Sequence, residues 1–212
     1  MAPLLKNLYN KEYIQTLSSE IQSIYPSFEK NHFTSSVFDT EWEHKELKQR
    51  MRHIVICLHT YLPQKYSQAI EVLKKLFTSL PEGMNLQNII FQDFVEVYGI
   101  DDFTTSISAL ECFTIDSSSE FAIRKFIIAY PEQTMLQMRL WAKHENYQIR
   151  RLASEGCRPR LPWAITLKMF IKNPQDVISI LELLLDDESL YVRKSVANNL
   201  NDISKDHPQL IK

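Results

Sequence analysis

Residues 141–151, WAKHENYQIRR, and residues 184–194, LLDDESLYVRK, share one pattern of apolar, polar and basic positions. The match places Asn146 on Ser189, and both are residue types that cap the start of a helix. The offset, about 43 residues, is typical of HEAT and armadillo repeats, in which amphipathic helix pairs stack on one another. The sequence therefore predicts an all-α, HEAT/armadillo-like right-handed solenoid, built as a single domain over residues 1–212.

Helical spacing of apolar residues extends outward from this repeat along most of the chain. Helices are predicted within 1–28 and at 41–61, 66–80, 85–98, 103–113, 119–129, 135–143, 146–155, 163–171, 176–185 and 189–203. Residues 31–40 are predicted to form a linker. Trp42 and Trp141 are expected in the core. No alternating pattern predicts a β-strand.

Composition excludes several classes of function. Three glycines in 212 residues leave no glycine-rich phosphate loop. The six histidines lack metal-ligand spacing, so we expect no metal and no cofactor. The three cysteines form no CxxC pair and are interpreted as reduced thiols. Without an apolar run long enough to span a membrane, the expected location is the bacterial cytosol.

Basic pairs recur at matching positions of the repeat. They are Arg124/Lys125, Arg150/Arg151 and Arg193/Lys194. A formal net charge of −2 does not exclude one basic face. Register-matched pairs are expected to line up as a surface stripe that suits a phosphate backbone, although basic pairs on helices are also common as plain solvated surface.

The segment Asn146–Trp163, NYQIRRLASEGCRPRLPW, concentrates the chemistry. Asn146 is expected to cap a helix that Gly156 closes in the left-handed conformation. Glu155 then lies in the last turn, where the helix dipole disfavours a carboxylate, so it is a candidate functional group. The alternative is that Glu155 simply pairs with Arg151 or Arg158.

This segment, together with VRKSVANNLND at 192–202 and the following ISKDHP, resembles the DNA alkylation repair glycosylases built from HEAT-like repeats. The run SEGCRPRLPW is closer to the AlkC branch than to the AlkD branch. The resemblance is strongest over residues 118–208. It implies a monofunctional glycosylase that removes cationic methylated bases, chiefly 3-methyladenine-like lesions, from double-stranded DNA, with the duplex in the concave face and the lesion not fully flipped into a pocket.

The resemblance also implies the site. Glu155 and Asp202 would be the catalytic acids and Trp163 the aromatic neighbour of the lesion. The implied or expected DNA contacts are Glu120, Phe121, Arg124, Arg150, Arg151, Arg158, Arg160, Arg193 and Lys194. Some AlkC proteins carry a C-terminal immunoglobulin-like domain. A sequence that ends at Lys212 has no room for one, so its hold on DNA is not expected here.

Other interpretations of these residues remain open at this point. Glu120 could cap its helix, Phe121 could be core, and Asp202 could pair with Lys205. Trp163 could be a buried residue at a helix start. Arg158 and Arg160 could be ordinary loop charges. The protein could also be a non-catalytic DNA-binding or protein-scaffold module. The sequence does not rank 3-methyladenine, 3-methylcytosine and 1-methyladenine as lesions, and it indicates a monomer.

Overall fold

The computed structural model describes residues 4–81, 83 and 86–211, and within these ranges the secondary structure is helical with no strand. The chain divides into two compact units, Met1–Ser117 and Ser118–Lys212. The second unit begins where the sequence resemblance begins. The single domain over residues 1–212 remains a prediction. No helix in the described ranges has both the length and the apolar character needed to cross a membrane.

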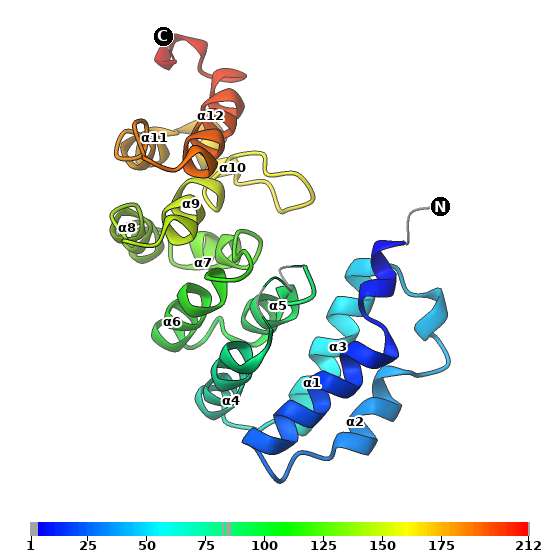
Figure 1. Ribbon diagram of the computed structural model, residues 1–212. Helices are drawn as coiled ribbons and strands as arrows, with labels where there is room; N and C mark the ends of the chain where they lie inside the picture. Colours follow the sequence, from blue (N-terminus) through cyan, green and yellow to red (C-terminus); the bar gives the residue numbers. More distant parts are fainter. Residues whose placement is uncertain (1–3, 82, 84–85, 212) are drawn as a thin grey trace. The chain divides into compact units, whose positions relative to one another are not determined.

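The first unit contains six α-helices among its described residues (Figure 1). They are α1 (Lys11–Ile24), α2 (Lys30–Val37), α3 (Leu47–Tyr61), α4 (Tyr66–Ser79), α5 (Ile89–Tyr98) and α6 (Phe103–Thr114). Helix α5 is the aromatic-rich segment predicted to be a buried helix, and Phe91 and Phe94 are fully buried. Trp42 is 4 % exposed, which confirms its place in the core.

Helix α2 replaces the predicted linker at residues 31–40, so that prediction was wrong. Phe33 and Val37, one turn apart, are both fully buried, and α2 packs against α1 and α3. Burying a Phe and a Val from one face stabilises by about 1.5–3 kcal/mol each. This packing outweighs the weak helix propensity of a segment rich in Ser, Thr and Asn.

The second unit contains the repeat. Its helices are α7 (Ile123–Ala129), α8 (Pro131–Trp141), α9 (Tyr147–Glu155), α10 (Lys168–Lys172), α11 (Gln175–Leu181) and α12 (Leu190–Ser204). In Figure 1, α8 and α11 lie on one side of this unit and α9 and α12 on the other, and α9 packs on α12. The helix pairs α8–α9 and α11–α12 are therefore successive repeats, as the offset predicted. Trp141 is 1 % exposed and belongs to this core.

Gly156 does not close α9 in the left-handed conformation, contrary to the prediction. Its φ is −63°, and helical geometry continues through it. A Cβ there would lie 2.7 Å from Ile123 Cγ2 and 2.9 Å from Met138 Cε. The glycine is thus required by the close approach of α7 and α8 to the end of α9.

Candidate active site

Glu155 ends α9 and faces α12 instead of solvent. The side chain of Asn146 caps the start of the helix by accepting the Gln148 amide at 2.8 Å, as predicted. Ser195 of α12 donates to Glu155 Oε2 at 2.6 Å, and its Oγ also lies 3.0 Å from Ser154 Oγ. A hydroxyl from the next repeat therefore fixes the orientation of a carboxylate that the helix dipole alone would disfavour.

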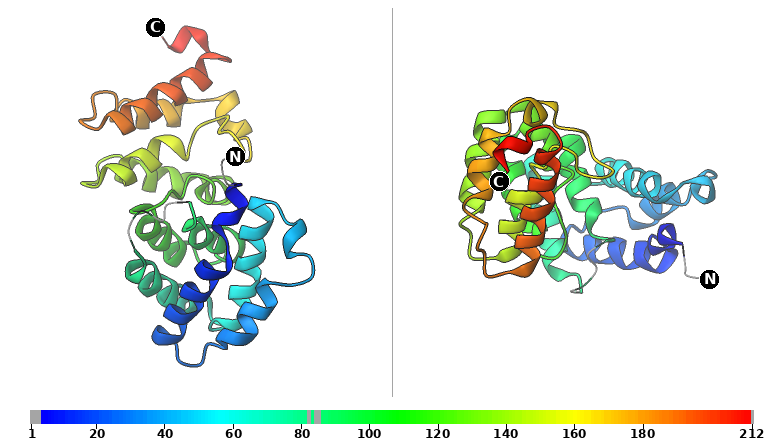
Figure 2. Two further views of the ribbon diagram at one scale, coloured as in Figure 1. Left: turned by 45° about the vertical axis from the view of Figure 1, so that its right-hand side comes forward. Right: turned by 90° about the horizontal axis from the view of Figure 1, so that it is seen from above.

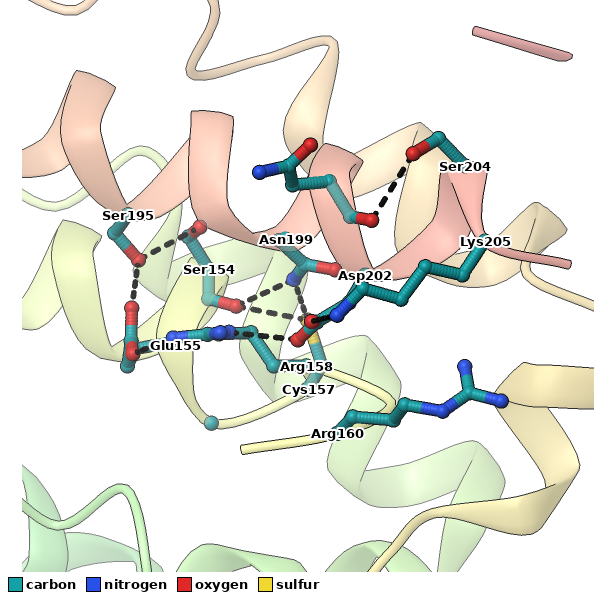
Figure 3. Close-up of polar contacts among 12 residues, drawn as sticks. Ser154, Glu155, Cys157, Arg158, Arg160, Ser195, Asn199, Asp202, Ser204 and Lys205 are labelled. Atoms are coloured by element: carbon teal, nitrogen blue, oxygen red, sulfur yellow. Dashed lines mark hydrogen bonds and ion pairs between the residues drawn. The ribbon is translucent and has the colours of Figure 1, made fainter. Parts of the chain in front are cut away.

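Arg158 bridges the two predicted catalytic acids (Figure 3). Its Nη1 donates to Glu155 Oε1 at 2.6 Å, and its Nε donates to Asp202 Oδ2 at 3.0 Å. Burial alone would lower the pKa of Arg158, but its hydrogen bonds to the two carboxylates and their charges raise it. One guanidinium thus holds both acids in fixed positions and keeps them close together.

Asp202 comes from α12, on the face that packs against α9. Lys205 donates to its Oδ1 at 3.1 Å, one turn further along the helix. The ion pairs considered as alternative roles, Glu155 with Arg158 and Asp202 with Lys205, are therefore present. Arg151 Nη2 also lies 3.6 Å from Glu155 Oε1. Each carboxylate oxygen has two lone pairs, so these contacts leave acceptor capacity for a water molecule.

The two implied catalytic acids are buried. Glu155 is 4 % exposed and Asp202 is 3 % exposed, so both lie beneath the surface. They are not sealed in apolar surroundings, because Arg158 and Arg151 adjoin them and their side chains are 11 % and 14 % exposed. The carboxylates therefore lie in a partly dehydrated position, where charge interactions are stronger than at an open surface.

Glu120 forms a second acid–base pair in the same unit. It accepts a charged hydrogen bond from Arg151, and Ser118 donates to its Oε2 at 2.5 Å. The Arg151 guanidinium also lies 4.9 Å from the ring centroid of Tyr191, a cation–π distance. Arg151 therefore lies between Glu120 and Glu155 and is only partly available to DNA.

Trp163 lies in a loop, so the predicted helix start at residue 163 was wrong, and the alternative of a buried Trp163 is excluded. Helix α10 starts only at Lys168, and Trp163 is 82 % exposed with φ 63°. The loop, residues 156–167, protrudes from the stacked helices of this unit (yellow in Figure 1, and in the right-hand view of Figure 2). It carries an indole in a position where a ligand can reach it.

Arg124 and Arg150 are buried, contrary to the predicted surface stripe of basic residues. Arg124 is fully buried, and its guanidinium donates to three backbone carbonyls of the 156–167 loop. Arg150 is 8 % exposed and donates to both carboxylate oxygens of Asp187, at 2.6 and 3.0 Å. Neither arginine presents its charge to a phosphate, because helical register places these positions against the neighbouring repeat.

The remaining predicted DNA contacts differ in availability. Arg193 and Lys194 are exposed on the first turns of α12, and Arg193 donates to the carbonyl of Glu188 at 3.0 Å. Arg160 is partly exposed and pairs with Asp206, one Nη2–Oδ1 contact measuring 3.0 Å. Phe121 is partly buried beside Glu120. Arg193 and Lys194 are thus the exposed charges of the predicted set.

Sequence reasoning missed three polar residues that shape the site: Ser154, Ser195 and Asn199. Asn199 donates to the Ser154 carbonyl at 2.7 Å, which ties α12 to the end of α9. A signal was present, since Ser195, Asn199 and Asp202 follow one another at spacings of four and three on α12. A polar stripe on the buried face of a helix needs partners, and here it finds them on α9.

Cys157 lies next to the acids without being a nucleophile. It is fully buried, and burial raises the pKa of its thiol to about 12. Its Sγ donates to the Ala153 carbonyl at 3.1 Å. Cys57, Cys112 and Cys157 are all free thiols, which agrees with the absence of a disulfide framework.

Fold and site together define a helical-repeat protein with a buried pair of carboxylates bridged by an arginine, and an exposed indole on the loop that follows. The DNA alkylation repair enzyme family model matches residues 102–212, and the chain belongs to this family. Its solved structural neighbour, described next, is similarly HEAT-like, which confirms the predicted fold class.

The similarity to individual proteins extends over the whole sequence. The chain is 46 % identical over 208 residues to the uncharacterized protein YhaZ of Bacillus subtilis (strain 168), covering 98 % of this chain and 57 % of that protein. It is 40 % identical, with a TM-score of 0.93, to the Pseudomonas fluorescens alkylpurine DNA glycosylase AlkC bound to DNA containing an abasic site analog. That match covers all of this chain and 58 % of the AlkC chain. The chain thus spans a little over half the length of both relatives.

Proposed function

We propose that the protein is a monofunctional DNA glycosylase that hydrolyses the N-glycosidic bond of cationic alkylated bases in duplex DNA, the first step of base excision repair. The observation that carries the proposal is the Glu155–Arg158–Asp202 bridge beside the Trp163 loop, on a chain of the DNA alkylation repair family. We further propose that it acts in the cytoplasm as a monomer, without a metal or cofactor.

The chemistry explains why these residue types suit the reaction. A cationic purine leaves as a neutral base, so the bond breaks without the general acid that ordinary glycosidases need. Positive charge then develops on the sugar, and a carboxylate held nearby stabilises it. Such a group also orients the attacking water and accepts its proton. The demands on the protein are therefore a fixed negative charge and a positioned water.

The charge balance of the bridge meets the first demand. Two carboxylates and the one guanidinium of Arg158 leave one net negative charge within a nearly buried cluster. The Lys205 side chain that also contacts Asp202 is 59 % exposed, so solvent screens much of its charge. Glu120 and Arg151 balance each other. The hydrogen-bonded groups of the bridge therefore keep a negative balance that favours a developing cation, and the nearby buried charge of Arg124 offsets part of it.

Trp163 supplies the selectivity in this proposal. An indole face attracts a cation by about 0.5–2 kcal/mol, and a neutral base gains less from the same contact. Its 82 % exposure makes it available to a base that remains in or near the duplex. Arg193 and Lys194 would contact phosphates and set the register of the duplex without reading its sequence.

The direct test is release of bases from defined duplexes, measured by chromatography and mass spectrometry. Substrates carry 3-methyladenine, 3-methylcytosine or 1-methyladenine, and a uracil duplex of the same sequence is the neutral control. We expect release of at least one cationic base and no release of uracil. If no methylated base appears above the enzyme-free blank, the glycosylase proposal fails.

A non-catalytic DNA-binding module is the second candidate, favoured by one observation: both acids are buried and already paired with cations. It predicts no base release together with duplex binding that weakens steeply with salt. Absence of duplex binding at low salt would leave a protein scaffold as the remaining interpretation.

A further inference from the structure

Arg124 is a buried cation that the proposed mechanism does not use. It lies on α7 and is fully buried, one of the largest side chains in the molecule without solvent exposure. Its guanidinium donates to backbone carbonyls, and none of these acceptors is a carboxylate. A charge buried at such a cost needs a structural or functional reason, because neutral residues of similar size are available.

The acceptors of Arg124 lie on both arms of the 156–167 loop. Its Nη1 donates to the Gly156 carbonyl at 3.0 Å and to the Arg158 carbonyl at 2.7 Å, on the outgoing arm. Its Nε and Nη2 donate to the Ile165 carbonyl at 2.7 and 2.5 Å, on the returning arm. The planar guanidinium thus joins residues that a loop would otherwise leave free to separate.

The loop needs such a restraint because its backbone is strained at the tip. Trp163 has φ 63°, a left-handed conformation that costs a residue with a Cβ roughly 1 kcal/mol or more. Within the loop, the Leu167 amide donates to the Pro159 carbonyl at 3.1 Å and the Ala164 amide to the Leu161 carbonyl at 3.2 Å. A strained conformation persists only where surrounding contacts fix it, and the hydrogen bonds from Arg124 to both arms of the loop are among these contacts.

The charge of Arg124 is retained despite burial. The pKa of Arg124 is lowered to about 10, mainly by burial; the charge of the neighbouring Arg158 acts in the same direction, and Cys157 and nearby acids oppose the shift. The guanidinium is therefore still protonated at neutral pH and keeps its full set of donors. Charged hydrogen bonds to carbonyls are stronger than neutral ones.

We propose that Arg124 is a positioning residue: by holding the carbonyls of Gly156, Arg158 and Ile165 it fixes the loop that presents Trp163 and the backbone from which Arg158 reaches the two acids. This replaces the expected role of Arg124 as a DNA contact. The structural part stands by itself, and only its consequence for base release rests on the proposed function.

The test uses nuclear magnetic resonance to measure amide hydrogen exchange in the loop of two variants, Arg124→Lys and Arg124→Met. Lysine keeps the charge but reaches fewer carbonyls, and methionine keeps the bulk alone. We expect the Ala164 and Leu167 amides to exchange at least tenfold faster in both variants than in the wild type. Unchanged loop exchange in the folded variants would overturn the proposal.

Arg150→Lys is the matched control, because Arg150 is also buried and also donates to carbonyls, those of His144 and Glu145. We expect this variant to accelerate exchange at Ser189, whose amide donates to the Asp187 carboxylate, and to leave Ala164 and Leu167 unchanged. Equal acceleration of the loop in Arg150→Lys would show a general loss of stability and would overturn a specific role for Arg124.

A reading from the wild type covers the case in which the variants do not fold. The side-chain Nε–H of Arg124 should exchange with water at least tenfold more slowly than that of Arg139, which is 43 % exposed. Equal rates would contradict the proposed hold on Ile165.

Base release tests the consequence of this positioning for activity. We expect a lower kcat in Arg124→Lys than in Arg150→Lys, with a similar KM for the duplex. If the wild type releases no base, the proposed function fails while the exchange measurements still decide the role of Arg124.

Discussion

Two arginines at opposite ends of α9 make the same kind of contact with different surroundings. Arg150, in the first turn, pairs with Asp187 and with the carbonyls that precede the helix. Arg158, just beyond the last turn, bridges Glu155 and Asp202. Arg150 closes one repeat onto the next, whereas Arg158 collects two acids from two repeats. Paired charges alone therefore do not distinguish a structural site from a functional one.

The difference lies in what else surrounds each arginine. The partners of Arg150 are Asp187, whose carboxylate accepts the Ser189 amide, and the exposed Glu188. These contacts hold the turn before α12. Around Arg158, Glu155 also contacts Ser195 and Arg151, and Asp202 also contacts Lys205. The loop that carries Trp163 includes Arg158 itself. We infer that the Arg150 cluster serves stability and the Arg158 cluster serves chemistry, and the predictions below separate the two.

The largest effect on stability is expected at Arg150. Arg150→Met leaves the Asp187 carboxylate without its cation, so we expect a loss of about 3–5 kcal/mol in the free energy of unfolding. Arg158→Met should cost less, about 1–3 kcal/mol, because Glu155 keeps Ser195 and Asp202 keeps Lys205. Urea denaturation of both variants measures this difference. A larger loss at Arg158 than at Arg150 would contradict the division of roles.

Trp163→Ala should affect chemistry without affecting stability. The indole is 82 % exposed, so we expect the free energy of unfolding to change by less than about 0.5 kcal/mol. Loss of a cation–π contact of about 0.5–2 kcal/mol corresponds to a rate of base release about 2- to 30-fold lower. Single-turnover kinetics on a 3-methyladenine duplex measure this. An unchanged rate would remove Trp163 from the site.

Lys194→Ala should weaken DNA binding with little change elsewhere. Each phosphate contact removed lowers the slope of log affinity against log salt by about 1. Fluorescence anisotropy with a labelled duplex between low and moderate salt gives the slope. Arg150→Lys is the control and should leave the slope unchanged. The opposite pattern would restore Arg150 to the DNA-contacting set.

The smallest expected effect concerns pH. Burial would raise the pKa of Asp187, but the hydrogen bonds from Arg150 and the Ser189 amide hold it below the ordinary 3.8. A carboxyl with a lowered pKa stabilises the folded state above its unfolded pKa and loses that contribution as pH falls. Asp187→Asn should therefore be less stable than wild type at pH 6, by roughly 1 kcal/mol, and the gap should narrow by pH 3. A constant gap in urea midpoints would contradict this.

The sequence predicts the architecture well because the architecture depends on periodic burial. The repeat offset, the cap at Asn146 and the buried Trp42 and Trp141 all follow from local patterns that the structure bears out. The failures at residues 31–40 and 163–171 concern segments whose conformation is set by distant partners. Phe33 is held by neighbouring helices, and the loop before α10 by Arg124.

The candidate site follows the same division. The resemblance implied Glu155 and Asp202 as the catalytic acids, which stays a prediction, and in the structure both accept hydrogen bonds from Arg158. Which basic residues face solvent could not be predicted, because helical register between repeats decides it. Arg124 and Arg193 occupy comparable basic pairs, yet one is fully buried and the other exposed.

The central claim is that the two bridged carboxylates act as one catalytic unit, and Glu155→Gln and Asp202→Asn test it most directly, singly and together. Both substitutions preserve size, and circular dichroism confirms folding. We expect each to lower single-turnover release of 3-methyladenine by about 100-fold or more, and the double variant to be little worse than the poorer single variant. Release at the wild-type rate by all three variants would contradict the account.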